Sequence, residues 1–261
     1  MSLLVITATR GSSLHLEATV RSVAALGDSA RHVLVCPEAL GKTLAKAYPH
    51  TQVVHESGGG LYAAINDARS SAKEDFVTYI NDDDLLDAAG LVAARRCLAS
   101  DESLAFVYGR VAMIDAQGKE LGELPIARRA EDLLALIAGG IMPLAQPGTL
   151  CRRSGLDKLG WFDSTFRLAG DLDLFVRALT AGLTFAYVDQ RVALFRIHAG
   201  QLSKAADEAR EEHARAISGL ELSPSLCEAA LRRFRWDNRW VYLQRMLRHG
   251  PKRMSTLYKH G

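Results

Sequence analysis

The chain has little cysteine, and the cysteines that it has are far apart. Its 261 residues contain four of them, none in a CxxC pair: Cys36, Cys97, Cys151 and Cys227. Zinc sites and the disulfide frameworks of small secreted proteins both need regularly spaced cysteines, so the pattern argues against either. Reduced thiols in a cytoplasmic protein are the simpler interpretation.

An excess of one charge and a long apolar run are also missing. The formal net charge of +2 is too small to indicate a nucleic-acid-binding protein. The N-terminal apolar run, Leu3 to Ile6, is too short for a signal-peptide core. Leu133 to Cys151 carries no charge, but Gly139-Gly140 and Pro147-Gly148 interrupt it. These interruptions predict a short helix, a loop and a strand in place of a membrane span.

The GxGxxG turn of dinucleotide-binding domains is absent after the first expected strand, where Thr7–Ser12 reads TATRGS. What is present is an alternation of short apolar runs with amphipathic segments. The expected strands are Leu3–Thr7, His32–Cys36, Thr51–His55 and Phe76–Ile80. The expected helices are Leu14–Leu26, Ala39–Ala47, Leu61–Ala72 and Asp87–Ala99. This order predicts an α/β domain with a mostly parallel sheet and helices on both faces.

The second half is expected to mix strands and helices. Turn residues at Asp115–Gly118 separate the apolar runs Ala105–Ile114 and Lys119–Leu124, which predicts a β-hairpin. The other expected elements are helices at Glu131–Ala138 and Asp171–Ala181 and strands at Thr149–Cys151, Phe185–Val188 and Ala193–Ile197. From Leu202 onward the pattern is helical, with a break at Ser223-Pro224.

Three adjacent carboxylates, Asp82, Asp83 and Asp84, follow the apolar run Phe76–Ile80. Carboxylates this close repel one another, and a hard divalent cation that prefers oxygen ligands offsets the repulsion. Because open α/β sheets bind ligands beyond the carboxyl ends of their strands, the cluster indicates a metal–diphosphate site. The alternative is that Asp84 or Asp87 caps the following helix.

Four motifs, taken in order, make the chain similar to the family 2 glycosyltransferases of the GT-A fold. They are the glycine-rich turn and helix start at His55–Asn66, the cluster Asn81–Asp84, the segment from Gln146-Pro147-Gly148 through Gly160-Trp161-Phe162-Asp163 to Gly170-Asp171-Leu172-Asp173, and the closing segment Phe195–Ser203. Each motif is weak alone, and the shared order is what makes the match specific. The resemblance implies a GT-A catalytic domain over residues 1–203. The helical pattern and basic composition of the rest indicate an extension over residues 204–261.

The resemblance also implies a metal-assisted transfer of a sugar from a nucleotide-sugar donor, a hexosyltransferase-type reaction of class EC 2.4. Mn²⁺ or Mg²⁺ would neutralise the charge that develops on the diphosphate leaving group. The implied metal residues are Asp83, Asp84 and His198. The implied donor-binding residues are Thr7, Thr9, Glu38, Gly60, Asn66, Asn81 and Asp82. A structural role is the alternative for His198, as for any lone histidine.

By the same resemblance Asp171 is the general base. It would take the proton from the acceptor hydroxyl as that oxygen attacks the anomeric carbon opposite the diphosphate. A single displacement of this kind inverts the anomeric configuration. The alternative is that Asp171 and Asp173 only begin the helix that follows, where carboxylates suit the helix dipole.

Several positions depart from the family pattern. Cys36–Ala39 stands where an Asp-Gly-x-Ser turn usually reads the nucleotide base, and Gln146 stands where a histidine is frequent. The resemblance therefore predicts the reaction class better than it predicts the identity of the donor. A UDP-sugar is the expected donor, and a glycan or lipid-linked saccharide of bacterial cell-envelope polysaccharide biosynthesis is the expected acceptor.

Two alternative functions remain. A nucleotidylyltransferase that forms sugar nucleotides would need a glycine- and arginine-rich loop where Thr7–Ser12 stands. A catalytically inactive nucleotide-binding module of the same fold is the other alternative, and the presence of both Asp83 and Asp171 argues against it.

The C-terminal segment is strongly basic. Ala229 to Gly261 contains nine Lys or Arg residues and one acid, Asp237. Apolar side chains within it share one helical stripe: Trp236, Trp240, Leu243 and Leu247. Basic residues beside tryptophan suit an anionic membrane surface, which predicts a cytoplasmic protein in peripheral contact with the inner face of a membrane. The alternative is that the stripe packs on the catalytic domain.

Overall fold

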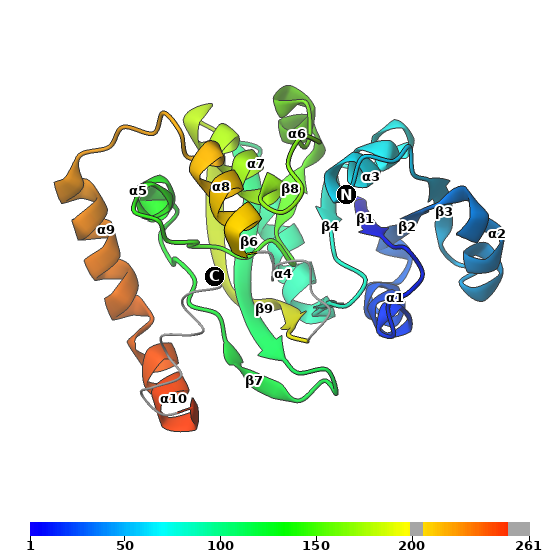
Figure 1. Ribbon diagram of the computed structural model, residues 1–261, viewed down its shortest axis with the longest axis horizontal. Helices are drawn as coiled ribbons and strands as arrows, with labels where there is room; N and C mark the ends of the chain where they lie inside the picture. The colour runs from blue at the N-terminus through cyan, green and yellow to red at the C-terminus, as the bar shows by residue number, and fades with distance from the viewer. Residues whose placement is uncertain (199–205, 250–261) are drawn as a thin grey trace.

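A nine-stranded sheet forms the centre of the computed structural model, which describes residues 1–198 and 206–249 (Figure 1). Seven strands lie along it in the order β3 (Gln52–His55), β2 (Ala30–Cys36), β1 (Leu3–Ala8), β4 (Phe76–Tyr79), β8 (Leu150–Arg152), β6 (Leu104–Ile114) and β9 (Thr184–Arg196). The short strand β5 (Leu85–Leu86) pairs with β9 at the edge, and β7 (Glu120–Glu123) pairs with β6.

The first half of the sheet is parallel, as the sequence predicted. Strands β3, β2, β1 and β4 all pair in parallel. Strand β1 is buried on both sides, with Leu4 and Ile6 in one hydrophobic cluster and Leu3 and Val5 in the other. Burial on both faces is typical of parallel strands covered by helices.

Helices cover both faces of this half. They are α1 (Leu16–Ala24), α2 (Glu38–Ala47), α3 (Leu61–Asp67, continued by the 3₁₀ turn Ala68–Ser71) and α4 (Ala88–Ser100). Ala94 of α4 belongs to the cluster of Leu3 and Val5, whereas Ile65 of α3 belongs to the cluster of Leu4 and Ile6. The expected start of α1 at Leu14 is wrong by two residues, because Leu14 is exposed and precedes the helix.

The second half of the sheet mixes directions. Strand β8 is antiparallel to both β4 and β6, the predicted hairpin β6–β7 is antiparallel, and β6 and β9 are parallel. The helices here are α5 (Leu133–Ala138), which follows the 3₁₀ turn Ala130–Asp132, α6 (Arg153–Leu159) and α7 (Gly170–Thr180). The mostly parallel order therefore describes the first half, and β8 joins it to the second.

Strand β9 corrects an expectation of two separate strands. Its polar segment Asp189–Arg191 stays within one strand because it bulges: Gly109 pairs with Val188, but the next residue pairs with Arg191. Gly109 permits the bulge, since a Cβ atom there would lie 2.6 Å from the carbonyl oxygen of Gln190.

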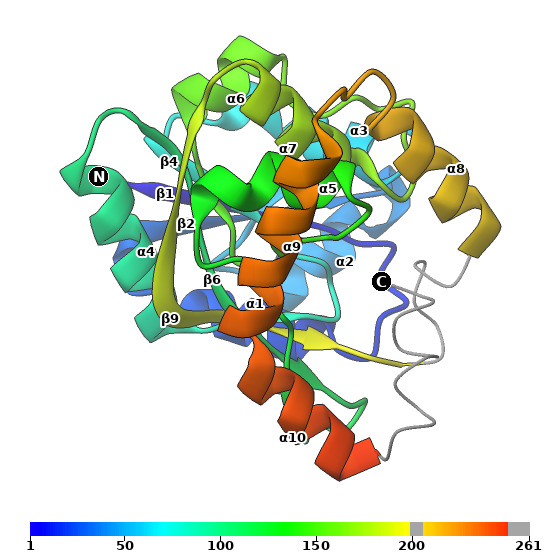
Figure 2. The same cartoon turned by 90° about the vertical axis from the view of Figure 1, so that its left-hand side faces the viewer.

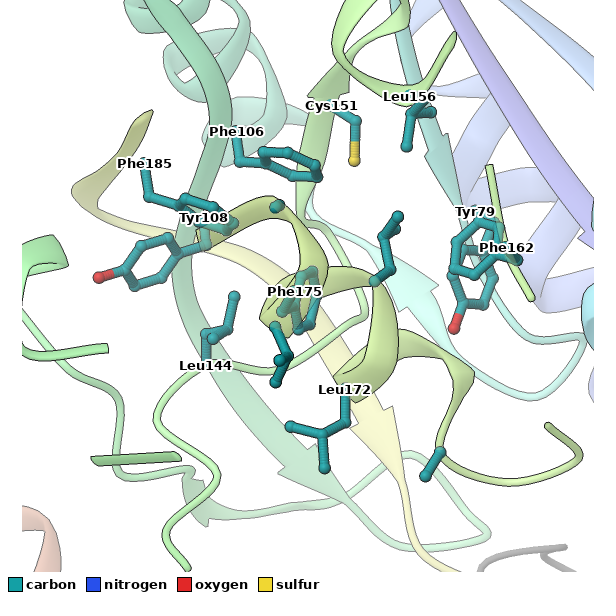
Figure 3. Close-up of a cluster of buried hydrophobic side chains, with 14 of the residues drawn as sticks. Tyr79, Phe106, Tyr108, Leu144, Cys151, Leu156, Phe162, Leu172, Phe175 and Phe185 are labelled. Carbon is teal, nitrogen blue, oxygen red and sulfur yellow. The ribbon is translucent and has the colours of Figure 1, made fainter. Parts of the chain in front are cut away.

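Aromatic side chains pack between this half of the sheet and α7 (Figure 3). The rings of Phe106 and Phe185 stack with centroids 4.5 Å apart, and Phe175 of α7 meets both rings edge-on. Such pairs add stability beyond their burial. They fix the position of α7, which carries Asp171 in its first turn.

Three helices follow residue 205: α8 (Ala206–Ala216), α9 (Pro224–Asp237) and α10 (Arg239–His249). The predicted break at Ser223-Pro224 is confirmed, with Ser223 capping α9. Ala216 and Phe234 join the main hydrophobic cluster of the α/β domain. The expected domain boundary between residues 203 and 204 lies outside the described residues and stays a prediction.

Candidate active site

The acidic cluster Asn81–Asp84 forms a tight turn directly beyond β4. Ile80 still follows the sheet, because its N–H donates to the carbonyl of Ile6, and the N–H of Asp84 then donates to the carbonyl of Asn81. The turn therefore lies at the carboxyl ends of the parallel strands β1 and β4, where open α/β sheets bind ligands. Asp87, not Asp84, caps α4.

Asp82 faces the loop that follows β1. The hydroxyl of Thr9 donates to Oδ2 of Asp82 at 2.6 Å, and the hydroxyl of Ser13 donates to the Asp82 carbonyl at 2.9 Å. Burial raises the pKa of the Asp82 carboxyl above its ordinary value, and the bond from Thr9 opposes that rise. These contacts join two of the expected donor-binding residues, Thr9 and Asp82, into one unit.

Asp83 meets His198 across the sheet. Oδ2 of Asp83 lies 2.8 Å from Nε2 of His198, and both side chains are partly exposed. The backbone carbonyl of Asp83 accepts from Nε of Arg196 at 2.7 Å. The structure thus brings together two of the three expected metal residues, which are 115 positions apart in the sequence. The rest of the closing motif, residues 199–203, lies outside the described part of the chain.

Asp84, the third expected metal residue, is buried completely. Its Oδ1 accepts from the backbone N–H of Arg196 at 2.7 Å, and its Oδ2 lies 3.4 Å from Nδ2 of Asn81. Burial and the neighbouring charge of Asp83 raise the pKa of the Asp84 carboxyl well above its ordinary value. Asp84 therefore ties the acidic turn to β9, while Asp83 points to the more open side.

The side chains of Asp83 and His198 fit a divalent cation whose coordination is completed by a bound ligand. Within residues 1–198 and 206–249, no group of three or more His, Cys, Asp or Glu side chains is arranged to hold a metal ion. The spacing of 2.8 Å between Asp83 Oδ2 and His198 Nε2 lets both atoms reach one ion. Mg²⁺-type ions lie about 2.1 Å from their ligand atoms and commonly use one or two protein ligands together with substrate phosphates.

Two further side chains border this site, and neither was among the expected site residues. The ring of His15, which precedes α1, lies 5.5 Å from the ring of His198. Arg196 is almost fully buried and also donates to the carbonyls of Asp115 and Ala116 in the β6–β7 turn. His15 belongs to no recognisable local motif. Arg196 lies in the closing segment Phe195–Ser203, but its contacts with the acidic turn are distant in sequence and gave no local signal.

Asp171 lies in the first turn of α7. Its Oδ1 accepts from the backbone N–H of Leu172 at 2.9 Å and from the hydroxyl of Tyr62 at 3.3 Å. Burial raises the pKa of the Asp171 carboxyl above its ordinary value, against the effect of these two donors. Among the described residues Oδ2 has no hydrogen-bond partner, so it remains able to take a proton.

Aromatic side chains lie between Asp171 and the acidic turn Asn81–Asp84. Tyr62 is in α3, directly after the glycine-rich turn, and its ring stacks on Phe162. Tyr79 is the last residue of β4, immediately before the acidic turn, and it lines one small cavity together with Asp171 and Phe162. Asp171 therefore lies beside the strand that leads into the acidic turn Asn81–Asp84.

The remaining expected donor residues occupy different places. Thr7 is buried in β1, with its hydroxyl 3.0 Å from Nε2 of His32. Glu38 begins α2 and is exposed. Gly60 precedes α3 with φ of 98°, a conformation that favours glycine.

The side-chain amide of Asn66 is hydrogen-bonded to the backbone of Phe162. Its Nδ2 donates to the carbonyl of Phe162 at 2.8 Å, and its Oδ1 accepts from the N–H of Phe162. Asp173 likewise acts through Arg177: the two side chains pair at 2.8 Å, and the guanidinium also donates to the carbonyls of Leu159 and Trp161. Both residues hold the segment that leads to Asp171.

The chain matches a known protein family over nearly its whole length. The family model described as glycosyltransferase-like family 2 matches residues 2–248. No curated protein gives a significant match. The chain is similar to the structure of S. aureus TarS residues 1–349 in complex with UDP-GlcNAc, with a TM-score of 0.64 and 15% identity over 97% of this chain and 78% of that one.

A second similar structure is the mannosyltransferase PcManGT from Pyrobaculum calidifontis in complex with GDP-Man and Mn²⁺. The TM-score is 0.59, with 17% identity over 94% of this chain and 73% of that one. Similarity at these levels of identity shows a shared fold, the GT-A glycosyltransferase fold.

Proposed function

The chain belongs to glycosyltransferase-like family 2, and we propose that it moves a sugar from a nucleotide-sugar donor to a hydroxyl group of a glycan or lipid-linked acceptor, with inversion. The observation that carries this proposal is the pairing of two sites at one end of the sheet. Asp83 and His198 form an acidic, partly exposed site beyond β4, and Asp171 lies beside the last residue of the same strand.

A nucleoside diphosphate sugar is the donor that suits the first site. The similar structures carry UDP-GlcNAc in one case and GDP-Man with Mn²⁺ in the other, and we propose a UDP-sugar for this chain. Asn81, Thr9 and Asp82 would face the nucleoside, since their side chains gather beyond β1 and β4. Gly60 would let the backbone approach the donor closely.

Asp83 and His198 would hold a divalent cation, Mn²⁺ or Mg²⁺. Such an ion supplies Lewis-acid stabilisation of the negative charge on the diphosphate leaving group. Asp84 supports Asp83 from within the fold, because its carboxylate is hydrogen-bonded to the backbone of Arg196. Direct ligation by Asp84 stays a prediction of the sequence.

Asp171 would act as the general base. Its free Oδ2 would accept the proton of the acceptor hydroxyl while that oxygen attacks the anomeric carbon and the diphosphate leaves from the opposite face. Tyr62 and the N–H of Leu172 hold Oδ1 and so fix the direction of the carboxylate. The raised pKa brings the carboxyl closer to the pH at which it works, which favours proton transfer.

A two-step experiment tests this function. Binding of nucleoside diphosphates and nucleotide sugars is measured by calorimetry with Mn²⁺, with Mg²⁺ and with EDTA, and the best donor is then incubated with saccharide acceptors. We expect metal-dependent donor binding and a product of inverted configuration by NMR. Donor binding without transfer to any acceptor would favour the inactive-module alternative, and pyrophosphate release from a nucleoside triphosphate would favour a nucleotidylyltransferase.

A further inference from the structure

The apolar stripe of the C-terminal helices faces solvent. Trp236 at the end of α9 is 66% exposed, and Trp240 and Leu247 of α10 are 61% and 76% exposed. Leu243 and Met246 of α10 are exposed as well. The alternative that this stripe packs on the catalytic domain is therefore wrong. Large apolar side chains gathered on one exposed face mark an interaction surface.

The opposite face of the same helices is anchored to the α/β domain. Phe234 is buried in the main cluster, and the side chain of Asn238 bonds to both the N–H and the carbonyl of Ile126. Arg245 of α10 donates to the carbonyl of Glu123 in β7 at 2.9 Å. Figure 2 shows α9 and α10 together on the outside of the molecule. These contacts fix which side of the helices faces outward.

Arginines border the stripe. Arg232, Arg235 and Arg239 are exposed, and the guanidinium of Arg239 lies 4.4 Å from the ring centroid of Trp236. Of the acids on α9, Asp237 pairs with Arg129 at 3.6 Å, and the exposed Glu228 lies 3.8 Å from Arg232. The exposed surface formed by Arg232, Arg235, Trp236, Arg239, Trp240, Leu243 and Leu247, called here the tryptophan–arginine face, is apolar along its centre and positive along its side.

We propose that the tryptophan–arginine face binds the surface of an anionic lipid bilayer. Apolar side chains that enter the headgroup region, flanked by arginines that meet anionic lipids, are the pattern of helices that lie in the plane of a membrane. Among the described helices, none is long and apolar enough to cross a membrane.

The anchored side of α10, opposite the tryptophan–arginine face, is joined to the donor site through a short series of contacts. Arg245 of α10 contacts Met113 near the end of β6, the following turn contacts Arg196 through Asp115, and Arg196 donates to the carbonyl of Asp83. In a protein bound through this face, the donor site would therefore be connected directly to the membrane-bound helix. This consequence rests on the proposed function and fits an acceptor on a lipid carrier.

Vesicle flotation of the full chain without substrates tests the proposal. Phosphatidylcholine vesicles are compared with vesicles that also contain phosphatidylglycerol. We expect binding to the anionic vesicles only, and weakening by added salt. Replacing Arg232, Arg235 and Arg239 with Gln should weaken binding on the order of 100-fold at low salt, because each arginine near the surface contributes about fivefold. The double variant W236S/W240S should weaken binding at high salt too.

Matched controls use residues of the same type elsewhere. Leu226→Ser removes an exposed leucine from α9 outside the tryptophan–arginine face, and Arg21→Gln with Arg210→Gln removes exposed arginines from α1 and α8. These controls should bind like the original protein. Equal loss in the controls, or no binding to anionic vesicles at low salt, would overturn the proposal. So would a dimer in light scattering that the W236S/W240S variant dissociates, because the partner would then be a second copy. Each outcome is independent of glycosyl transfer.

A separate observation concerns α8. Glu212 is almost fully buried, and its carboxylate accepts three backbone N–H groups at 2.8 Å, those of Arg167, Leu168 and Ala169. Burial alone would raise the pKa of this carboxyl, but the three N–H groups and Arg215 lower it below the ordinary value. Glu212 thus holds the loop that leads into α7 as an anion.

That loop is also hydrogen-bonded to Tyr62, which contacts Asp171. The hydroxyl of Tyr62 donates to the carbonyl of Leu168 at 3.1 Å and lies 3.3 Å from Oδ1 of Asp171. Ala169 directly precedes α7, and Asp171 is in its first turn. Movement of the loop therefore displaces both the carboxylate and the hydroxyl group that orients it.

From this network we infer that Glu212 is a positioning residue for Asp171, an inference that rests on Asp171 acting as the base. Glu212→Gln places an amide N–H₂ group against backbone N–H donors. We expect kcat to fall about tenfold or more, since misplacement of a catalytic group by about 1 Å has large effects. The dissociation constant for the donor should stay unchanged, because the donor site lies beyond β4.

The control is Glu211→Gln, which changes an exposed glutamate one residue away on α8. Rates are normalised to the folded fraction from circular dichroism, and Glu212→Asp tests partial rescue by a shorter anion. The pH profile of kcat should shift in Glu212→Gln and not in Glu211→Gln. An unshifted profile, or a loss of kcat that follows the folded fraction alone, would overturn the positioning role. A lost rate in Asp171→Asn with a normal rate in Glu212→Gln would reject Glu212 and leave the proposed function intact.

Discussion

The acidic turn beyond β4 and the first turn of α7 each present carboxylates, but the surroundings of these carboxylates differ. Asp83 lies against an imidazole, 2.8 Å away, on a partly exposed surface. Asp171 is surrounded by aromatic side chains, and its hydrogen bonds come from a tyrosine hydroxyl and one backbone N–H. The first arrangement concentrates negative charge, and the second disfavours it.

Under the proposed function, this difference would assign charge stabilisation to the first site and proton transfer to the second. Adjacent carboxylates suit the turn to a cation and a diphosphate. A single half-buried carboxylate with a raised pKa holds a proton more readily than an exposed one, which suits a base that must receive one. Substitutions at the two sites should therefore impair different properties, donor binding at the acidic turn and the transfer rate at Asp171.

The largest effect is expected from Asp171→Asn. The amide cannot take the acceptor proton, so kcat should fall by about 10²–10⁴-fold. Donor affinity should be unchanged, because a base acts in the transition state. Calorimetry with donor and a rate assay with acceptor measure the two quantities. Transfer within a few-fold of the original rate would remove Asp171 as the base, and inactivity of Asp173→Asn alone would move the role to that residue.

A binding defect, in contrast, is expected from Asp83→Asn. Losing the carboxylate that faces His198 should weaken donor binding in Mn²⁺ or Mg²⁺ by about tenfold or more, which corresponds to 1.4 kcal/mol. Binding in EDTA should change little. A variant that keeps metal-dependent affinity for the nucleoside diphosphate would show that the metal lies elsewhere.

Local patterns predicted most of the fold. The strands of the first half were found because each is a short apolar run, and their parallel order follows from the helices between them. The single strand β9 was missed because its continuity depends on Gly109, a residue of another strand. Polar residues in a bulge look like a turn when their partner strand is unknown.

The candidate site shows the same limit. Asp83 and Asp171 were proposed from motifs, since their neighbours in sequence carry a recognisable pattern. The burial of Asp84 depends on Arg196, 112 residues away. The role of Glu212 depends on a loop that precedes it by more than 40 residues. Nothing near either residue in sequence indicates its partner.

A smaller effect, on stability, is expected from Asp84→Ala. The change leaves the buried N–H of Arg196 without its acceptor, which should lower the free energy of unfolding by about 1–3 kcal/mol. For a chain of this size each kcal/mol lowers Tm by about 2–4 °C. The control Asp207→Ala removes an exposed carboxylate of α8 and should leave Tm unchanged. An unchanged Tm in Asp84→Ala would instead indicate a carboxylate that serves only the metal site.

The smallest effect is expected from Tyr62→Phe, and it appears in the pH dependence. Burial raises the pKa of Asp171, whereas the bond from Tyr62 favours the ionised form and lowers that pKa. The base works when ionised, so the rate rises as pH increases through the pKa of Asp171. Removing the hydroxyl should raise this pKa further and move the acid limb of the kcat profile to higher pH. Tyr48→Phe, which changes a tyrosine at the end of α2, should leave the limb in place. A limb that stays in place in Tyr62→Phe, or moves to lower pH, would mean that the hydroxyl does not stabilise the Asp171 carboxylate, and the contrast between the two carboxylate sites would then rest on burial alone.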